Sequence, residues 1–179
     1  MSADHIQIFA DGSVIGNPGP GGYGVIMMCG PHKKEFSKGF VRSTNNRMEL
    51  MGVIEALKTI RHRHLPIVIT SDSQYVIKAI DKNWVKGWIQ EWQTGAEGKK
   101  NKDLWMQYAA VAKDLSITAV WVKGHADNEH NNKCDKMAND AARGKDKVHD
   151  TGFVESVPKP AKPKKNGKTS GSRASRIHW

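Results

Sequence analysis

Four acidic residues could act together chemically if the fold brings them to one place: Asp11, Glu49, Asp72 and Asp135. A single carboxylate is most often a helix cap, a partner of the helix dipole or a solvated surface group. Grouped carboxylates raise one another's pKa values and repel unless a cation neutralises them. Such a cluster would bind a hard divalent ion, Mg²⁺ or Mn²⁺, through oxygen ligands. Two such ions can activate a water and stabilise the leaving oxygen of a phosphodiester.

The elements that must position these acids follow an α/β pattern. Alternating apolar residues, punctuated by glycine and proline, predict strands near residues 5–10, 23–29, 34–40, 67–71 and 117–122. Apolar residues at helical spacing predict helices near residues 45–61, 73–81, 103–114 and 129–143. This order predicts an α/β fold with a mixed five-stranded sheet and helices on both faces.

Each acid has a defined place in that arrangement. Asp11 and Asp72 end predicted strands, and Ser73 could help to start the helix that follows. Glu49 lies near the start of the helix predicted at 45–61, which Thr44 or Asn45 could cap, and the fourth acid lies on the last helix. Ligand sites gather beyond the carboxyl ends of parallel strands. We therefore expect the four carboxylates to converge at one edge of the sheet.

Length and composition limit the classes of protein that are possible. With 179 residues, 38% hydrophobic and 26% charged, the chain is typical of one soluble globular domain. No apolar run approaches the roughly 18 residues of a membrane helix, so we expect no membrane partner. Met1 leads into the first strand without room for a secretory signal, which favours a cytoplasmic location. Cys29 and Cys134 are too few for a disulfide framework.

The net charge of +10 favours a polyanionic partner such as nucleic acid. Residues 158–179 contain seven Lys and Arg and no acidic residue. Their Lys, Pro, Gly and Ser content is too polar to bury a core. We predict a domain at residues 1–150 and a flexible basic tail at 151–179. The tail could contact nucleic acid, whereas Ile177 and Trp179 would suit docking on the domain or on a partner protein.

Four motifs carry a resemblance to a known family. They are DGSVIGNPGPGGYG from Asp11, TNNRMEL from Thr44, SDSQYV from Ser71, and GH followed by NNKCDKMA from Asn131. Together they resemble type 1 ribonuclease H in its bacterial form, over residues 5–143 and in the expected order. The resemblance implies a monomeric endonuclease with a ribonuclease H-like fold. Such an enzyme hydrolyses the RNA strand of RNA:DNA hybrids and leaves 3′-hydroxyl and 5′-phosphate ends.

The resemblance also assigns roles at the catalytic site. The four acids match the family's metal-binding catalytic residues, which with substrate bound hold two Mg²⁺ ions, and Mn²⁺ should also support activity. His125 matches a mobile histidine that moves protons or assists product release. Without the resemblance, a histidine in a glycine-containing loop is more often a plain polar residue, although titration near neutral pH suits a proton carrier.

Hybrid recognition requires polar groups that detect 2′-hydroxyls on one strand and deoxyribose on the other. By resemblance, the hybrid contacts are Asn17, Asn45, Asn46 and Gln74, with Trp84 on a DNA sugar. Likewise, Arg42, Thr44 and Asn101 resemble a pocket for a DNA-strand phosphate. Each has an ordinary structural alternative, because Asn-Pro-Gly forms turns and Thr or Asn caps helices.

The tryptophan-rich stretch departs from the bacterial pattern. Trp88, Trp92 and Trp105 are expected to pack, because aromatic residues four positions apart usually share a helix face. The family's protruding basic handle carries several Lys or Arg after its second tryptophan, where this chain has Ile89-Gln90-Glu91. We therefore expect a weaker handle, for which the basic tail could compensate.

Three other functional classes fit parts of the sequence. A non-catalytic hybrid-binding module would not need all four acids, and a metal-dependent cleavage assay separates it from a nuclease. A transposase or junction resolvase usually has extra domains or lacks the paired asparagines of TNNRME. A glycosidase could use two carboxylates, but four acids in a basic protein favour a nuclease.

Overall fold

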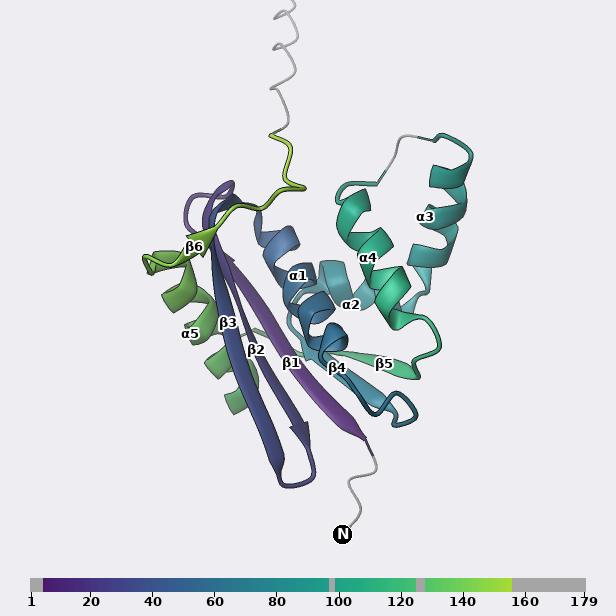
Figure 1. Ribbon diagram of the computed structural model, residues 1–179, viewed down its shortest axis with the longest axis horizontal. Coiled ribbons are helices and arrows are strands. Elements are labelled where there is room, and N and C mark those ends of the chain that lie inside the picture. Colours follow the sequence, from purple (N-terminus) through teal and green to yellow (C-terminus); the bar gives the residue numbers. More distant parts are fainter. Residues whose placement is uncertain (1–4, 97–98, 125–127, 156–179) are drawn as a thin grey trace, which may run out of the picture.

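The computed structural model describes residues 5–96, 99–124 and 128–155 (Figure 1). Its strands are β1 (Ile6–Val14), β2 (Gly19–Cys29), β3 (His32–Ser43), β4 (Ile67–Ser71), β5 (Ile117–Trp121) and β6 (Lys147–Val148). Its helices are α1 (Asn45–Lys58), α2 (Gln74–Asp81), α3 (Trp84–Gln93), α4 (Lys102–Ala112) and α5 (Glu129–Arg143).

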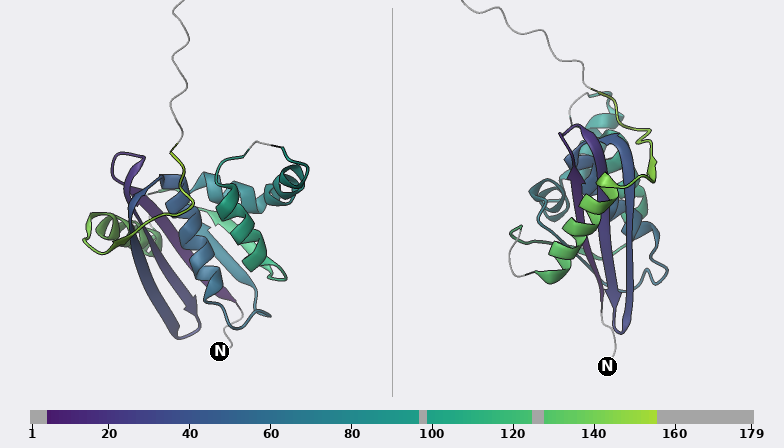
Figure 2. Two further views of the ribbon diagram at one scale, coloured as in Figure 1. Left: turned by 45° about the horizontal axis from the view of Figure 1, so that its top comes forward. Right: turned by 90° about the vertical axis from the view of Figure 1, so that its left-hand side faces the viewer.

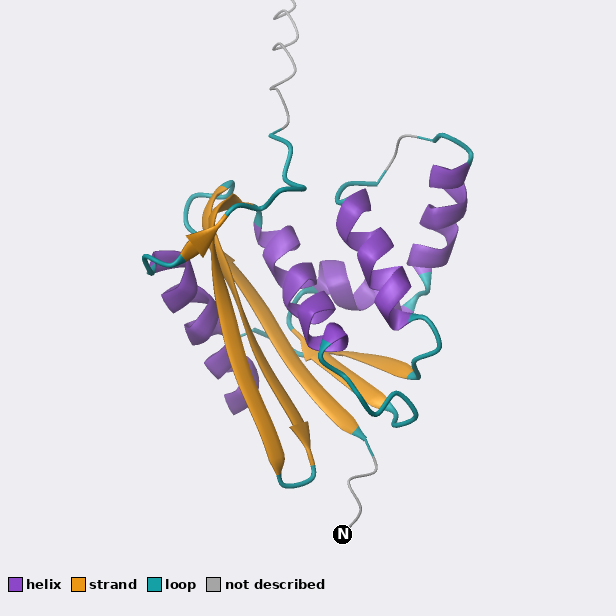
Figure 3. Ribbon diagram, in the orientation of Figure 1, coloured by secondary structure: helices purple, strands orange, loops and turns teal. Residues whose placement is uncertain are grey.

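The strands form one mixed sheet in the order β5-β4-β1-β2-β3-β6 (Figure 3). β1, β2 and β3 pair as an antiparallel meander, whereas β4 pairs in parallel with β1 and with β5. The sheet within the described residues thus has six strands rather than the predicted five. The sixth, β6, is a two-residue strand parallel to β3, and so short a strand has no alternating pattern to reveal it.

Helices cover both faces of the sheet, as predicted. The larger core lies between the sheet and α1, α2 and α4, and its fully buried side chains include Leu50, Ile54 and Trp105. α5 covers the opposite face of the sheet (Figure 2). There Phe9, Ile26 and Cys134 form a small separate core. Side chains of successive β1 residues point alternately into the two cores, because neighbouring side chains of a strand lie on opposite faces of the sheet.

β2 starts at Gly19, before the predicted start at residue 23, so it also includes Gly21 and Gly22. A Cβ atom at Gly22 would lie 2.6 Å from the Ala138 carbonyl oxygen, and one at Gly24 would lie 2.3 Å from that of Cys134. The glycines therefore let α5 pack directly on the strand backbone. This tertiary packing explains a strand at residues whose glycine content indicates a turn.

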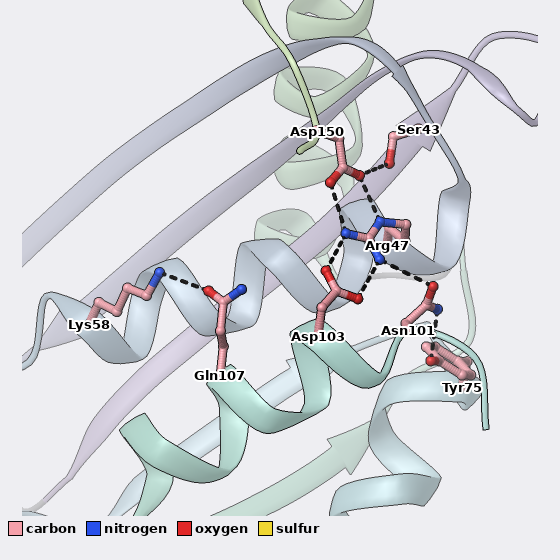
Figure 4. A network of polar contacts seen from close by, with 8 residues as sticks. All are labelled: Ser43, Arg47, Lys58, Tyr75, Asn101, Asp103, Gln107 and Asp150. Carbon is pink, nitrogen blue, oxygen red and sulfur yellow. Dashed lines mark hydrogen bonds and ion pairs between the residues drawn. The ribbon is translucent and has the colours of Figure 1, made fainter. Parts of the chain in front are cut away.

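Arg47 on α1 forms ion pairs that link the segment after α5 to α1 and α4 (Figure 4). This guanidinium is 3% exposed and donates to both oxygens of Asp150, at 2.7 and 2.8 Å, and both oxygens of Asp103, at 2.8 and 2.6 Å. Ser43 Oγ also donates to the Asp150 carboxylate. Residues 151–155, which belong to the segment predicted as tail, continue from this contact, and Glu155 forms an ion pair with Arg42.

α3 is a helix that the predicted boundaries do not include, although the spacing of its tryptophans is helical. It stands beside α4, away from the sheet (Figure 1). Trp88 packs against Trp92 and Trp105, with ring centroids 6.4 and 5.4 Å apart. Across the described helices, none combines the length and apolar character that crossing a membrane requires.

Candidate active site

Asp11 and Asp72 lie together at the same edge of the sheet. The parallel pairing of β1 with β4 runs to Phe9 and Thr70. Asp72 follows the end of β4 directly. Asp11 does not end β1 as predicted, because β1 continues to Val14 on its pairing with β2. It nevertheless lies just beyond the β4 pairing and is 5% exposed.

A glycine next to Asp11 brings Glu49 into the site. A Cβ atom at Gly12 would lie 2.4 Å from the Glu49 backbone nitrogen, so the first turns of α1 pack on bare strand backbone. Asn45 Nδ2 donates to one Glu49 oxygen at 2.7 Å, and Ser73 Oγ donates to the other at 2.5 Å. Both oxygens of this carboxylate are therefore held from two different elements.

α5 supplies the fourth acid. Its close contact with β2 at Gly24 and the 3.3 Å contact of Cys134 Sγ with the Phe9 carbonyl oxygen hold the helix against the sheet. Asp135 follows Cys134 and so comes to the edge that carries Asp11. One turn later, Asn139 Nδ2 donates to Asp135 Oδ1 at 2.8 Å.

Asp72, Asp135 and Glu49 all lie close enough to Asp11 to interact with it electrostatically. The pKa of Asp11 is raised to about 8, first by burial and then by Asp72, with further contributions from Asp135 and Glu49. The backbone N–H of Gly12 donates to Asp11 and lowers this pKa in part. The pKa of Glu49 is raised to about 7 by burial and by Asp72, against the lowering effect of the Ser73 hydrogen bond. Without a cation, Asp11 therefore retains its proton near neutral pH.

The donor chemistry of this cluster fits Mg²⁺ or Mn²⁺, which prefer carboxylate oxygen. Within residues 5–96, 99–124 and 128–155, the present side-chain positions bring no three His, Cys, Asp or Glu residues into a group that could hold a metal ion. The raised pKa values come first from burial and then from repulsion between the acids, and a divalent cation would offset both. His125 lies outside the described residues, so its predicted place beside the acids stays a prediction.

The residues predicted to bind the hybrid occupy two neighbouring regions. Asn17 Oδ1 accepts from the Asn45 backbone N–H at 3.1 Å, so it caps α1 from the β1–β2 turn. Thr44 precedes α1 but makes no side-chain cap, so the cap predicted for Thr44 or Asn45 comes instead from Asn17. A cavity of about 500 Å³ is lined by Asn46, Gln74, Tyr75, Lys78, Trp84, Trp88, Lys99, Lys100 and Trp105. Trp84 is 47% exposed there, in contrast to the buried Trp92 and Trp105.

The predicted phosphate pocket is tied to the Arg47 network. Asn101 Oδ1 faces Arg47 at 3.5 Å, and its Nδ2 donates to the Tyr75 hydroxyl at 3.0 Å (Figure 4). Arg42 already has an anionic partner, the Glu155 carboxylate. Sequence reasoning missed these partners, because Tyr75, Arg47 and Glu155 are separated along the chain from the residues they contact. It also missed Asn139, for which the four-residue spacing from Asp135 was an available signal.

Comparison with known proteins places this architecture in a family. The model of the RNase H family matches residues 3–143. The chain is 45% identical to Ribonuclease H of Aeromonas salmonicida over 151 residues, 83% of this chain and 97% of that protein. It is 44% identical to Ribonuclease H of Shewanella denitrificans over 154 residues, 85% of this chain and 96% of that protein.

A solved structure gives the same result. The chain resembles LC9-RNase H1, a type 1 RNase H with the type 2 active-site motif, with a TM-score of 0.67 and 29% identity. The match covers 87% of this chain and 79% of that one. Fold, acid cluster and relatives thus define an endoribonuclease. The chain belongs to the ribonuclease H family, which cleaves the RNA strand of RNA:DNA hybrids.

Proposed function

We propose that this chain hydrolyses the RNA strand of RNA:DNA hybrids by two-metal-ion catalysis and leaves 3′-hydroxyl and 5′-phosphate ends. The observation that carries the proposal is the burial of Asp11 among three other acids, which raises its pKa to about 8. A buried acid cluster is unfavourable in a metal-free chain and becomes favourable when cations neutralise it.

In this proposal, Asp11, Glu49, Asp72 and Asp135 hold two Mg²⁺ ions, or Mn²⁺, when substrate is bound. The ions would favour ionisation of the attacking water and neutralise the charge that develops on the leaving oxygen. Asn45 and Ser73 fix the Glu49 carboxylate through their hydrogen bonds. His125 carries the proton that the leaving 3′-oxygen takes up.

The remaining predicted contacts bind and orient the hybrid. Asn17, Asn45, Asn46 and Gln74 contact the sugar edges in the shallow groove, and Trp84 covers a deoxyribose. The phosphate of the DNA strand binds at Arg42, Thr44 and Asn101. The exposure of Trp84 beside Asn46 and Gln74 supports this proposal, because a planar apolar surface next to amides suits a sugar. The division at residue 150, the monomeric state and the cytoplasmic location stay predictions.

A cleavage assay tests the proposal directly. The protein is incubated with end-labelled RNA:DNA, RNA:RNA, DNA:DNA and single-stranded RNA in Mg²⁺, Mn²⁺ or EDTA. We expect internal cleavage of RNA in the hybrid only, in either metal and not in EDTA, with 5′-phosphate on the downstream product. Cleavage in EDTA, or equal cleavage of RNA:RNA, would contradict the proposed mechanism or substrate.

A further inference from the structure

A series of hydrogen bonds connects Asp135 on α5 to Ser13 on β1, the strand that carries Asp11. Ser13 Oγ lies 2.9 Å from Asn139 Oδ1, and Asn139 Nδ2 lies 2.8 Å from Asp135 Oδ1 and 3.0 Å from the Asp135 carbonyl oxygen. Ser13 is two residues after Asp11 on β1. All three side chains are partly buried. These hydrogen bonds therefore link β1 to α5 beside the acid cluster.

The chemistry of the three groups fixes the orientation of the amide. An ionised carboxylate only accepts hydrogen bonds, so the NH₂ end of Asn139 must face Asp135. The carbonyl end then faces Ser13, whose hydroxyl donates. Each side chain thus has a complementary partner, and reversing the amide would place two acceptors against each other.

This arrangement opposes a specific electrostatic force. Asp135 is one of the charges that raise the pKa of Asp11, so the two carboxylates repel across the site. Asp135 belongs to a helix surface, where a repelled side chain can turn toward water. The Asn139 amide holds Asp135 by one of about four lone-pair positions of the carboxylate and leaves the others for a cation. A neutral donor does this without competing for the metal.

We propose that Ser13 and Asn139 are positioning residues that hold Asp135 in the orientation that binds a divalent ion. This inference rests on the proposed function, since it assigns Asp135 to metal binding. Neither residue touches the substrate or the ion in this role. Ser13 acts through Asn139, and Asn139 acts through Asp135.

The test measures Mg²⁺ and Mn²⁺ binding to the full chain by titration calorimetry without substrate, beside the Mg²⁺ dependence of hybrid cleavage. Asn139→Ala should weaken metal binding about 10-fold, the usual scale for residues that orient a ligand. Ser13→Ala should weaken it less, and Ser13→Thr, which keeps the hydroxyl, should restore it. In the Asn139→Ala background, Ser13→Ala should add nothing, because residues that act in series are not additive.

Stability separates positioning from a general structural role. Alanine is the better helix former, so Asn139→Ala should leave the melting temperature in EDTA unchanged or higher while metal binding falls. Gln107→Ala, an exposed amide on α4, is the matched control and should change neither quantity. Unchanged metal binding in Asn139→Ala, with weakened binding in Asp135→Asn, would overturn only the positioning role of Ser13 and Asn139. Unchanged metal binding in Asp135→Asn would instead overturn the proposed metal site.

Discussion

At the scale of single residues, burial and the neighbouring acids destabilise the ionised form of Asp11 in the folded protein. Its pKa is about 8 in the folded chain and about 3.9 in an unfolded chain. Between these values the folded state binds the extra proton, so the stability of the metal-free protein falls as pH rises from about 4 to about 8. Below about pH 4 both states are protonated and this contribution no longer changes.

Replacing Asp11 by Asn should remove that loss. We expect Asp11→Asn to abolish nearly all cleavage and to raise the melting temperature in EDTA at pH 8, with a smaller gain at pH 5. Thermal unfolding followed by circular dichroism measures this difference. Asp140→Asn, an exposed acid on α5, is the control and should show no such pH dependence. A lower melting temperature for Asp11→Asn at pH 8 would contradict the repulsion described here.

His125 gives a prediction about rate rather than stability. His125→Ala should lower turnover by about 10²-fold, the usual scale of general acid–base assistance. Hybrid affinity, measured in Ca²⁺ or EDTA by fluorescence anisotropy, should stay the same. An equal loss of affinity and rate would identify His125 as a binding residue instead of a proton carrier.

At the scale of elements, glycines decide how close the helices that carry acids approach the sheet. Gly12 lies under the start of α1, and Gly24 lies under α5. In the sequence, Gly12 lies just after the strand predicted at residues 5–10, and Gly24 lies within the strand predicted at residues 23–29. Their real role depends on packing between segments far apart in the chain, which local patterns do not contain.

Gly12→Ala tests this role. The new Cβ would lie 2.4 Å from the Glu49 nitrogen and 2.8 Å from the Met48 carbonyl carbon, both backbone atoms. We expect α1 to shift, activity to fall strongly, and urea denaturation to show a loss of about 1–3 kcal/mol. Gly87→Ala is the matched control, because nothing lies within 4 Å of its Cβ on α3; it should stabilise by up to about 1 kcal/mol. Equal stability and activity in Gly12→Ala and wild type would refute the packing argument.

The sequence predicted the elements that depend on local periodicity. β4 and α5 have their predicted bounds, and α1, α2 and α4 begin and end within a few residues of theirs, whereas α3 was not predicted. The sequence singles out the four acids because each lies beside the end of a predicted strand or on a predicted helix. Arg47 and the Asn17 cap were not found as partners, since a hydrogen bond between distant segments has no signature in composition or spacing. Asn139 is different, because its four-residue spacing from Asp135 on one helix was a signal that the prediction did not use.

At the scale of the whole molecule, positive charge is concentrated in residues 158–179, which contain seven Lys and Arg and no acidic residue. We predict that truncation after Val157 leaves turnover at saturating hybrid unchanged but raises the Michaelis constant at low salt. It should also make affinity less dependent on salt, because fewer counterions are released. Steady-state kinetics from about 25 to 200 mM salt measure both effects. Unchanged values would favour docking of Ile177 and Trp179 over nucleic-acid binding.

The ion pair between Arg42 and Glu155 gives a second whole-molecule prediction. Hybrid phosphate and the Glu155 carboxylate would compete for one guanidinium. Glu155→Gln should therefore tighten hybrid binding, by at most about fivefold, since an exposed ion pair contributes up to about 1 kcal/mol. Glu55→Gln, which breaks the exposed pair with Lys58, is the control for lost charge. If the dissociation constant of Glu155→Gln for the hybrid is unchanged, the ion pair with Glu155 does not limit phosphate binding by Arg42.

The Arg47 network has a consequence for how the molecule opens. Opening of the segment around Asp150 would remove one of the two carboxylates that pair with the Arg47 guanidinium, which is 3% exposed in the closed structure. Breaking one partner of a buried pair costs about 3–5 kcal/mol, whereas chain ends usually fray at almost no cost. Amide hydrogens of β6 should therefore exchange with solvent as slowly as those at the start of α1, in one cooperative opening, despite the shortness of that strand.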